Sequence, residues 1–133
     1  MHQIKGKYLD NLRCEMEHPS STAIHTDAPK DNRGEGKFFS PTDLVAAALG
    51  SCMLTIIGIR ARDYGIEIGK PDFEIIKQMR TNPRKIKKIS ITIRFYESVP
   101  QDKRDFLEKE AKNCPVALSI SERIEQDITF QYA

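Results

Sequence analysis

The sequence predicts an α+β fold in which one long helix is buried by a sheet or by another subunit. Three observations lead to this prediction. A run of apolar and small residues extends from Leu44 to Ile59, two segments of alternating β-branched residues follow at 66–80 and 86–97, and an amphipathic segment occupies 101–113. At 133 residues the chain is expected to form a single domain over residues 1–133.

The N-terminal part of the chain is expected to contain a strand and a long loop. Leu12, Cys14 and Met16 alternate with charged residues, which is the pattern of a strand with one buried face. From 19 to 37 the composition shifts to Ser, Thr, Asp, Asn, Gly and Pro, and only residues 23–24 indicate a further short strand. A loop of this length in so small a domain often carries function.

The start of the central helix is the clearest local signal. Ser40 suits the N-cap, Pro41 suits the first helical position, and Asp43 can reach back in the manner of a capping box. Gly65 is a stop signal. Because the helix is apolar on all sides, it is expected to be buried, and its apolar run is expected to be too short to span a bilayer. No membrane association is therefore predicted.

The C-terminal half is expected to form a hairpin, two helical segments and a last strand. Asn82 and Pro83 mark the hairpin turn. Because a residue before proline avoids the helical conformation, Cys114 is expected at a helix boundary, with Pro115 opening a short new turn. A final strand is predicted over 124–132.

Composition and charge narrow the possible functions. The 21 Lys and Arg residues against 19 Asp and Glu leave a net charge of +2, too small to argue for a nucleic acid or an anionic membrane as partner. The first residues lack the apolar core of a secretory signal, so a cytoplasmic location is expected. Three cysteines in a reducing compartment favour catalytic or redox roles over structural disulfides.

The three cysteines differ in their contexts. Cys52 shares a helical stripe with apolar residues, which suits a core side chain as well as a reactive thiol, and Gly50 indicates the close approach of a neighbour or ligand. Cys114 would face unsatisfied N–H groups that favour a thiolate; a capping or packing role is the alternative. Cys14 lies on the apolar face of its strand and is expected to be a core thiol.

Two segments resemble motifs of one protein family. The run FSPTDLVAAALGSC, from Phe39 to Cys52, resembles the central-helix signature of the OsmC/Ohr family, and NCPV, from Asn113 to Val116, resembles its second-cysteine motif. The loop at 26–29 and the hairpin before the second cysteine fit the same order. The resemblance implies an OsmC-like fold: a long central helix packed with antiparallel sheets in an intertwined homodimer, with two active sites at the interface.

The same resemblance implies a thiol peroxidase for organic hydroperoxides. Cys52 would attack the peroxide and become a sulfenic acid, and Cys114 would resolve it as a disulfide. An external dithiol, typically a lipoylated or thioredoxin-like protein in this family, would reduce that disulfide, and neither a metal nor an organic cofactor is expected. The alternative is a binding module of the same fold that holds a small hydrophobic ligand at the dimer interface, with Cys52 only lining the pocket.

A cation is also expected near the reactive thiol, because apolar surroundings disfavour a thiolate. The resemblance implies an arginine from an early strand or loop, held by an acid ten positions before the reactive cysteine. That position is Thr42, so the acid is missing or replaced and the arginine is expected to be less firmly placed. Arg13 is the best positional match for the arginine, Arg33 is its rival, and a solvated surface charge is the alternative for Arg13.

The remaining polar motifs carry weaker signals. His18 and His25 lack the spacing of a metal site and are expected to order the loop or to lie in solvent. The basic cluster of Lys77, Arg80, Arg84, Lys85, Lys87 and Lys88 spans the hairpin tip without an aromatic stacking platform. It is expected to be a solvated turn rather than a nucleic-acid surface.

Overall fold

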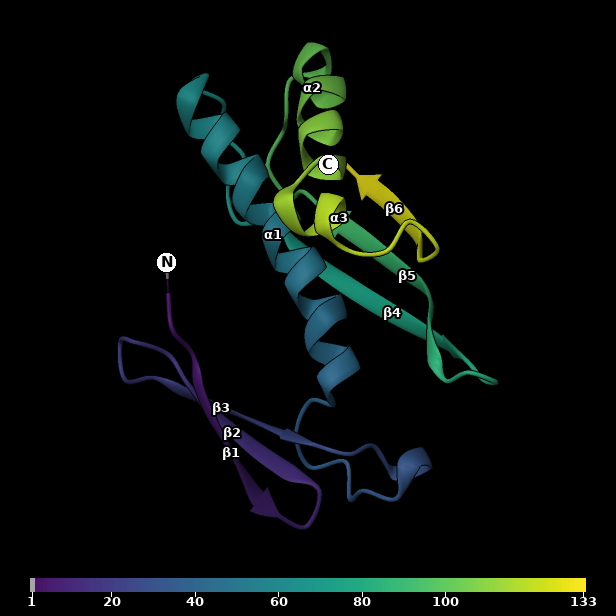
Figure 1. Cartoon of the computed structure of the whole chain (residues 1–133). Helices are drawn as coiled ribbons and strands as arrows, with labels where there is room; N and C mark the ends of the chain where they lie inside the picture. The colour runs from purple at the N-terminus through teal and green to yellow at the C-terminus, as the bar shows by residue number, and fades with distance from the viewer. Residues whose placement is uncertain (1) are drawn as a thin grey trace. The chain divides into compact units, whose positions relative to one another are not determined.

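The structure is a computed structural model that describes residues 2–133. Within those residues, three α-helices, one 3-10 helix and six strands in two sheets confirm the α+β class (Figure 1). The chain divides into two compact units, of which the first ends at Val45 and the second runs from Ala46 to Ala133.

The N-terminal unit contains an antiparallel sheet in the order β1–β2–β3. Its strands are β1 (Lys5–Asp10), β2 (Arg13–Glu17) and β3 (Ala23–Asp27), which confirms the strand around Cys14 and the short strand predicted in the loop. Leu12 was assigned to the strand but lies in the turn between β1 and β2, with a φ of 62°. A 3-10 helix occupies Lys30–Asn32.

The two faces of this sheet differ in chemistry. Through the strand register, one face of the sheet carries Tyr8, Cys14, Met16 and Ile24. The other face carries two cross-strand pairs, Lys7 with Glu15 and Arg13 with Asp27. Tyr8 and Ile24 are 61% and 52% exposed. Much of the apolar face of this sheet is therefore exposed.

Helix α1 (Pro41–Asp63) has the predicted boundaries. Ser40 N–H donates to Asp43 Oδ2 at 2.9 Å and Asp43 N–H donates to Ser40 Oγ at 3.1 Å, which confirms the capping box. The helix ends at Asp63, Gly65 follows with a φ of 65°, and the N–H of the residue after Gly65 donates back to the Ala61 carbonyl at 2.8 Å. This bond is typical of a Schellman motif, so glycine is required there for its left-handed conformation.

One expectation about α1 needs correction. By length and composition its 23 residues could cross a membrane, a property shared by core helices of soluble proteins, so the predicted shortness is wrong. Within a single chain the helix is buried along one stripe, which leaves its remaining faces for the second subunit that the family resemblance implies. The buried stripe consists of Ala46, Leu49, Gly50, Met53, Ile57 and Ala61, and the exposed positions include Ala48, Ser51, Thr55 and Ile59.

The C-terminal unit is built on a second sheet in the order β4–β5–β6. β4 (Asp72–Arg80) and β5 (Lys85–Arg94) form the predicted antiparallel hairpin, and β6 (Glu125–Gln131) pairs with β5 in parallel. The sheet is thus mixed, where antiparallel pairing was expected. The reason is the crossover through α2 (Gln101–Lys112) and α3 (Pro115–Ser119), which returns the chain so that β6 runs in the same direction as β5.

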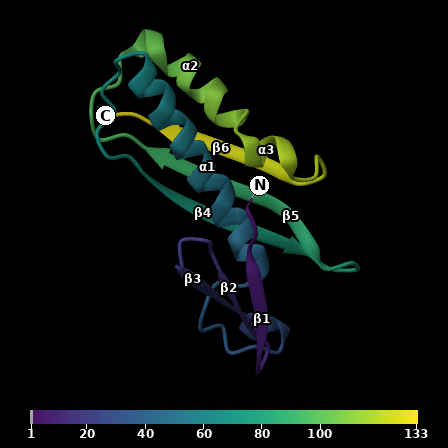
Figure 2. The same ribbon diagram turned by 60° about the vertical axis from the view of Figure 1, so that its left-hand side comes forward.

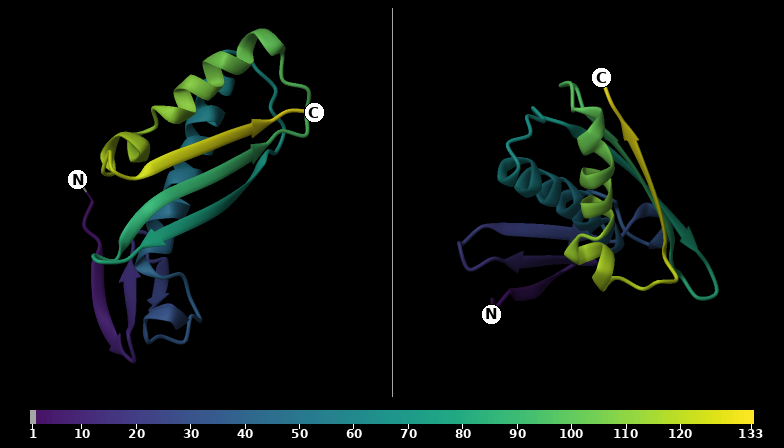
Figure 3. Two further views of the ribbon diagram at one scale, coloured as in Figure 1. Left: turned by 90° about the vertical axis from the view of Figure 1, so that its right-hand side faces the viewer. Right: turned by 90° about the horizontal axis from the view of Figure 1, so that it is seen from above.

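The core of the C-terminal unit lies between this sheet and its helices, which cover one face of the sheet (Figures 2 and 3). Its fully buried side chains include Leu49, Met53, Ile57, Ile89, Ile91, Ile93 and Leu107. A Cβ on Gly50 would come within 2.7 Å of the Phe73 ring and 2.9 Å of Ile75, both on β4. This contact confirms that the mid-helix glycine marks the close approach of a neighbour.

Candidate functional site

Cys52 and Cys114 are neighbours within the C-terminal unit. Cys52 is half-buried on α1, and Cys114 is fully buried as the N-cap residue of α3. The Cys52 thiol is close enough to raise the pKa of the Cys114 thiol, and neither cysteine forms a disulfide. The fold thus brings together the two cysteines that the sequence singled out.

The chain around Cys114 fixes its sulfur in place. Cys114 has an extended backbone, φ −66° and ψ 156°, and Pro115 opens α3 directly after it, as predicted. The Cys114 sulfur accepts a hydrogen bond from the Ala117 N–H at 3.5 Å, and the Ala117 carbonyl accepts one from Gln126 Nε2 at 3.1 Å. The cysteine is therefore tied through α3 to strand β6.

Burial decides the protonation of Cys114. Burial raises the pKa of the Cys114 thiol, and the neighbouring Cys52 thiol raises it further, while the Ala117 N–H acts in the opposite direction. The expectation that the helix N-terminus would favour a thiolate is therefore wrong for the resting protein. The helix has only five residues, so its few aligned peptide dipoles do not outweigh the desolvation of the sulfur.

Arg13 lies between two carboxylates in the N-terminal unit. Its Nε is 3.5 Å from Asp27 Oδ2, its Nη2 donates to Glu35 Oε1 at 3.1 Å, and its guanidinium lies 5.8 Å from the centre of the Phe38 ring. The Asp27 side chain is fully buried, and the Arg13 side chain is 22% exposed. Arg13 is thus a held, mostly buried cation rather than a solvated surface charge.

The two acids around Arg13 are stabilised in their ionised forms. The Lys37 backbone N–H, which donates to Asp27 Oδ2 at 3.0 Å, and then Arg13 lower the pKa of Asp27. The Asn11 side chain, followed by Lys37 and Arg13, lowers the pKa of Glu35. Sequence reasoning missed both acids. Asp27 faces Arg13 in the β2–β3 register. Had the strand predicted at 23–24 been extended to residue 27, this pair of opposite charges on facing strands would have indicated the contact.

Thr42 and Arg33 occupy other places in the N-terminal unit. Thr42 is the second residue of α1, and its Oγ1 lies 3.2 Å from Ser40 Oγ. The carboxylates that hold Arg13 come instead from β3 and from the loop before α1. Arg33 is exposed at the end of the 3-10 helix, with a φ of 71°.

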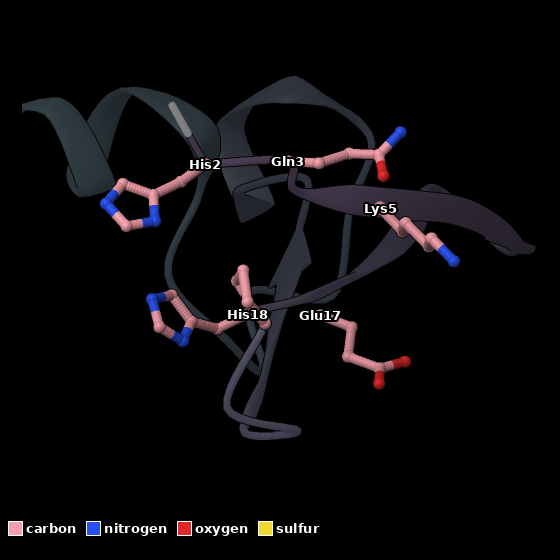
Figure 4. A pocket seen from close by; sticks show the side chains of 6 residues that line it. His2, Gln3, Lys5, Glu17 and His18 are labelled. Carbon is pink, nitrogen blue, oxygen red and sulfur yellow. The ribbon is translucent and has the colours of Figure 1, made fainter.

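The histidines order local structure. His18 Nδ1 accepts a hydrogen bond from the Ser20 N–H at 3.0 Å, and His25 Nε2 lies 2.9 Å from Glu15 Oε2. A pocket of about 430 Å³ is lined by His2, Gln3, Lys5, Glu17, His18 and Pro19, with both imidazoles toward one side of the view in Figure 4. Within residues 2–133, no group of three His, Cys, Asp or Glu side chains is placed to hold a metal ion.

Comparison with known proteins identifies a family pattern over most of the chain. The model of a family described as OsmC-like protein matches residues 34–129. A solved structure from Psychrobacter arcticus 273-4, provisionally assigned as an osmotic stress induced and detoxification response protein, is 42% identical. It superposes with a TM-score of 0.93 over 98% of this chain and 96% of that one.

More distant structures share the fold. An OsmC like protein from Mycoplasma pneumoniae has a TM-score of 0.81 at 17% identity, covering 100% of this chain and 97% of that one. An organic hydroperoxide resistance protein OsmC from Legionella pneumophila has a TM-score of 0.79 at 17% identity, covering 98% and 96%. At such identities the likeness concerns the fold alone. No curated protein matches the sequence.

Proposed function

Since the chain belongs to the OsmC-like protein family, we propose that it is a thiol-dependent peroxidase that reduces organic hydroperoxides. The observation that carries this proposal is the proximity of two free thiols, the half-buried Cys52 and the buried Cys114. A sulfenic acid formed on one thiol would have the other within reach, which is the requirement for a dithiol mechanism.

In the first step Cys52 is the nucleophile. Its thiolate attacks the terminal oxygen of the hydroperoxide, the O–O bond breaks, and the alkoxide leaves as an alcohol after taking up a proton. Cys52 is then a sulfenic acid. Cys52 is assigned this role because it is half-buried, whereas Cys114 is fully buried and held as a thiol.

In the second step Cys114 is the resolving thiol. It loses its proton, its sulfur attacks the Cys52 sulfur, and water leaves as the disulfide forms. The Ala117 N–H at 3.5 Å would stabilise the negative charge that develops on the Cys114 sulfur. An external dithiol, of the lipoylated or thioredoxin-like class, then reduces the disulfide and becomes oxidised itself.

Arg13 is our candidate for the cation that favours the Cys52 thiolate. Its guanidinium is held by Asp27 and Glu35, so its position does not depend on an acid at position 42. Two carboxylates at two different nitrogens of one guanidinium restrict its orientation more than a single contact does. We therefore propose that Asp27 and Glu35 position Arg13, and that Thr42 has no such role.

We also propose that the functional unit is a cytoplasmic homodimer. α1 leaves Ala48 and Ile59 exposed on one face, and the N-terminal sheet exposes Tyr8 and Ile24. Exposed apolar faces on two separate elements are more than a small monomer usually tolerates. A second copy of the chain is the occupant implied by the family fold.

Thiol counting tests the proposed function. The chain has three cysteines, and cumene hydroperoxide added at one equivalent should consume the thiols of Cys52 and Cys114 and leave Cys14. The Cys14→Ser variant is the matched control, since it should lose all of its titratable thiol under the same treatment. If all three wild-type thiols survive excess hydroperoxide, the protein is a binding module with Cys52 in its lining, and the peroxidase assignment is wrong.

A further inference from the structure

A cationic pocket lies at the free end of the β4–β5 hairpin. It has a volume of about 440 Å³ and is lined by Arg80, Lys85, Ile86, Lys87 and Arg123. Arg80 ends β4, the lysines belong to β5, and Arg123 lies in the turn before β6. Segments far apart in the sequence thus converge on one hollow, unlike a simple solvated turn in which neighbouring residues point outward.

The strand register brings like charges together at this point. Arg80 and Lys85 are direct cross-strand partners, an arrangement that is unfavourable when no anion compensates it. The register then shifts between Gln78 and Met79, and Lys87 is the extra residue of the resulting bulge. Bulges redirect side chains and occur often beside functional sites. The backbone therefore departs from regular pairing where the cations gather.

Other cations on the same sheet form ion pairs with carboxylates, whereas the cations that line the pocket do not. Lys88 lies 3.3 Å from Glu125 and 3.6 Å from Asp127, and Arg94 pairs with Glu74 at 3.1 Å. Within residues 2–133, by contrast, no carboxylate lies within ion-pair distance of the four cationic side chains that line the pocket. Their charges are left for an anion from outside the chain.

We propose that this pocket binds a small, multiply charged anion of the phosphate type. Several cations around one hollow match several negative charges, and arginine forks pair with phosphate oxygens in a bidentate manner. The volume falls within the range of small-molecule sites. Among the described residues, no aromatic side chain lines the pocket to stack a base, which disfavours a nucleic acid. This binding is independent of the thiol chemistry.

Titration of the full-length, isotopically labelled protein with inorganic tripolyphosphate at low ionic strength tests this assignment. Amide shifts in two-dimensional NMR spectra should be confined to the hairpin tip and the turn at Arg123, and they should weaken as salt is added. The double variant Arg80→Gln/Arg123→Gln should raise the Kd about tenfold or more, because two charge-assisted contacts are lost.

The matched control removes the same charge elsewhere. Lys103 and Lys109 are exposed on α2, and Lys103→Gln/Lys109→Gln should leave the Kd unchanged. An equal loss of affinity in both double variants, or amide shifts spread over the whole surface, would contradict specific binding of the anion in this pocket. Oligouridine and an oligoglutamate peptide serve as competing probes. If oligouridine or oligoglutamate binds at these residues more tightly than tripolyphosphate does, the ligand of the pocket is a nucleic acid or an acidic protein and not a small anion.

Discussion

The thiol of Cys52, half-buried on α1, lies beside the thiol of Cys114, the buried N-cap residue of α3. Both cysteines belong to the compact C-terminal unit. Cys14 lies in the other unit, on the face of the N-terminal sheet that carries Met16 and Ile24.

We therefore predict that one equivalent of an organic hydroperoxide produces an intramolecular disulfide between Cys52 and Cys114. Mass spectrometry of peptides from the oxidised, non-reduced protein should find this pair and leave Cys14 as a thiol. In Cys114→Ser, dimedone should trap a sulfenic acid on Cys52, because its resolving partner is gone. A principal disulfide that contains Cys14 would contradict the assignment of the resolving thiol.

The second prediction concerns the pH dependence of disulfide formation. Burial raises the pKa of Cys114 above the ordinary value of 9.0, so this thiol is protonated at neutral pH and its thiolate fraction grows as the pH rises toward the raised pKa. Condensation should therefore accelerate with pH, and the Cys52 sulfenic acid should accumulate at low pH. Dimedone labelling after rapid mixing at several pH values measures this. A constant yield of adduct would mean that deprotonation of Cys114 does not limit the step.

Local sequence signals predicted the ends of the helices well, because turns and caps depend on residues only a few positions apart. Ser40 with Asp43, Gly65, and Cys114 before Pro115 all mark boundaries where expected. The parallel pairing of β6 was missed, because it depends on how a crossover returns the chain rather than on any local pattern.

The site was predicted in part, and the missing part has a physical reason. Cys52 and Cys114 stand out through their motifs, but Asp27 and Glu35 do not, because their pairing with Arg13 depends on a strand register and a loop path. The protonation of Cys114 was also misjudged. A helix N-terminus can be read from the sequence, whereas the burial that outweighs it depends on packing.

Two glycines of α1 provide the third prediction. A Cβ at Gly50 would meet the Phe73 ring at 2.7 Å, so Gly50→Ala should lower the free energy of unfolding by about 1 to 3 kcal/mol through overpacking. Gly58 has nothing within 4 Å of a Cβ, so Gly58→Ala should raise it by about 0.5 to 1 kcal/mol through helix propensity. Urea denaturation measures both. Equal effects of the two substitutions would show that contact with β4 is not what requires glycine.

The fourth prediction is an obligate homodimer, since Ile59 on α1 and Ile24 on the N-terminal sheet are 46% and 52% exposed in a single chain. Sedimentation equilibrium should find dimers at micromolar concentration, and the melting temperature should rise with protein concentration. Ile59→Lys, which places a charge on the exposed face of α1, should weaken the dimer. Gln101→Lys is the control, because Gln101 is a polar, exposed residue at the start of α2 and its substitution adds the same charge outside the apolar faces. A folded wild-type monomer at micromolar concentration would contradict the prediction.

The last prediction separates Thr42 from the acids that hold Arg13. If Asp27 positions the guanidinium, Asp27→Asn should slow oxidation by an organic hydroperoxide about tenfold, because a neutral amide replaces one charged partner of Arg13. Glu35→Gln should have a smaller effect, since Glu35 is 49% exposed and water can replace its contact.

Thr42→Glu is the matched test of the vacant acid position. The added carboxylate at the first turn of α1 is favourable toward the helix dipole, so the variant should fold, yet its oxidation rate should remain that of the wild type because Arg13 already has two carboxylate partners. Stopped-flow measurements across pH on the wild type and the three variants decide between the positions. A faster Thr42→Glu variant together with an unaffected Asp27→Asn variant would return the positioning role to residue 42. A wild type without any peroxide reactivity would leave the binding module as the function of the fold.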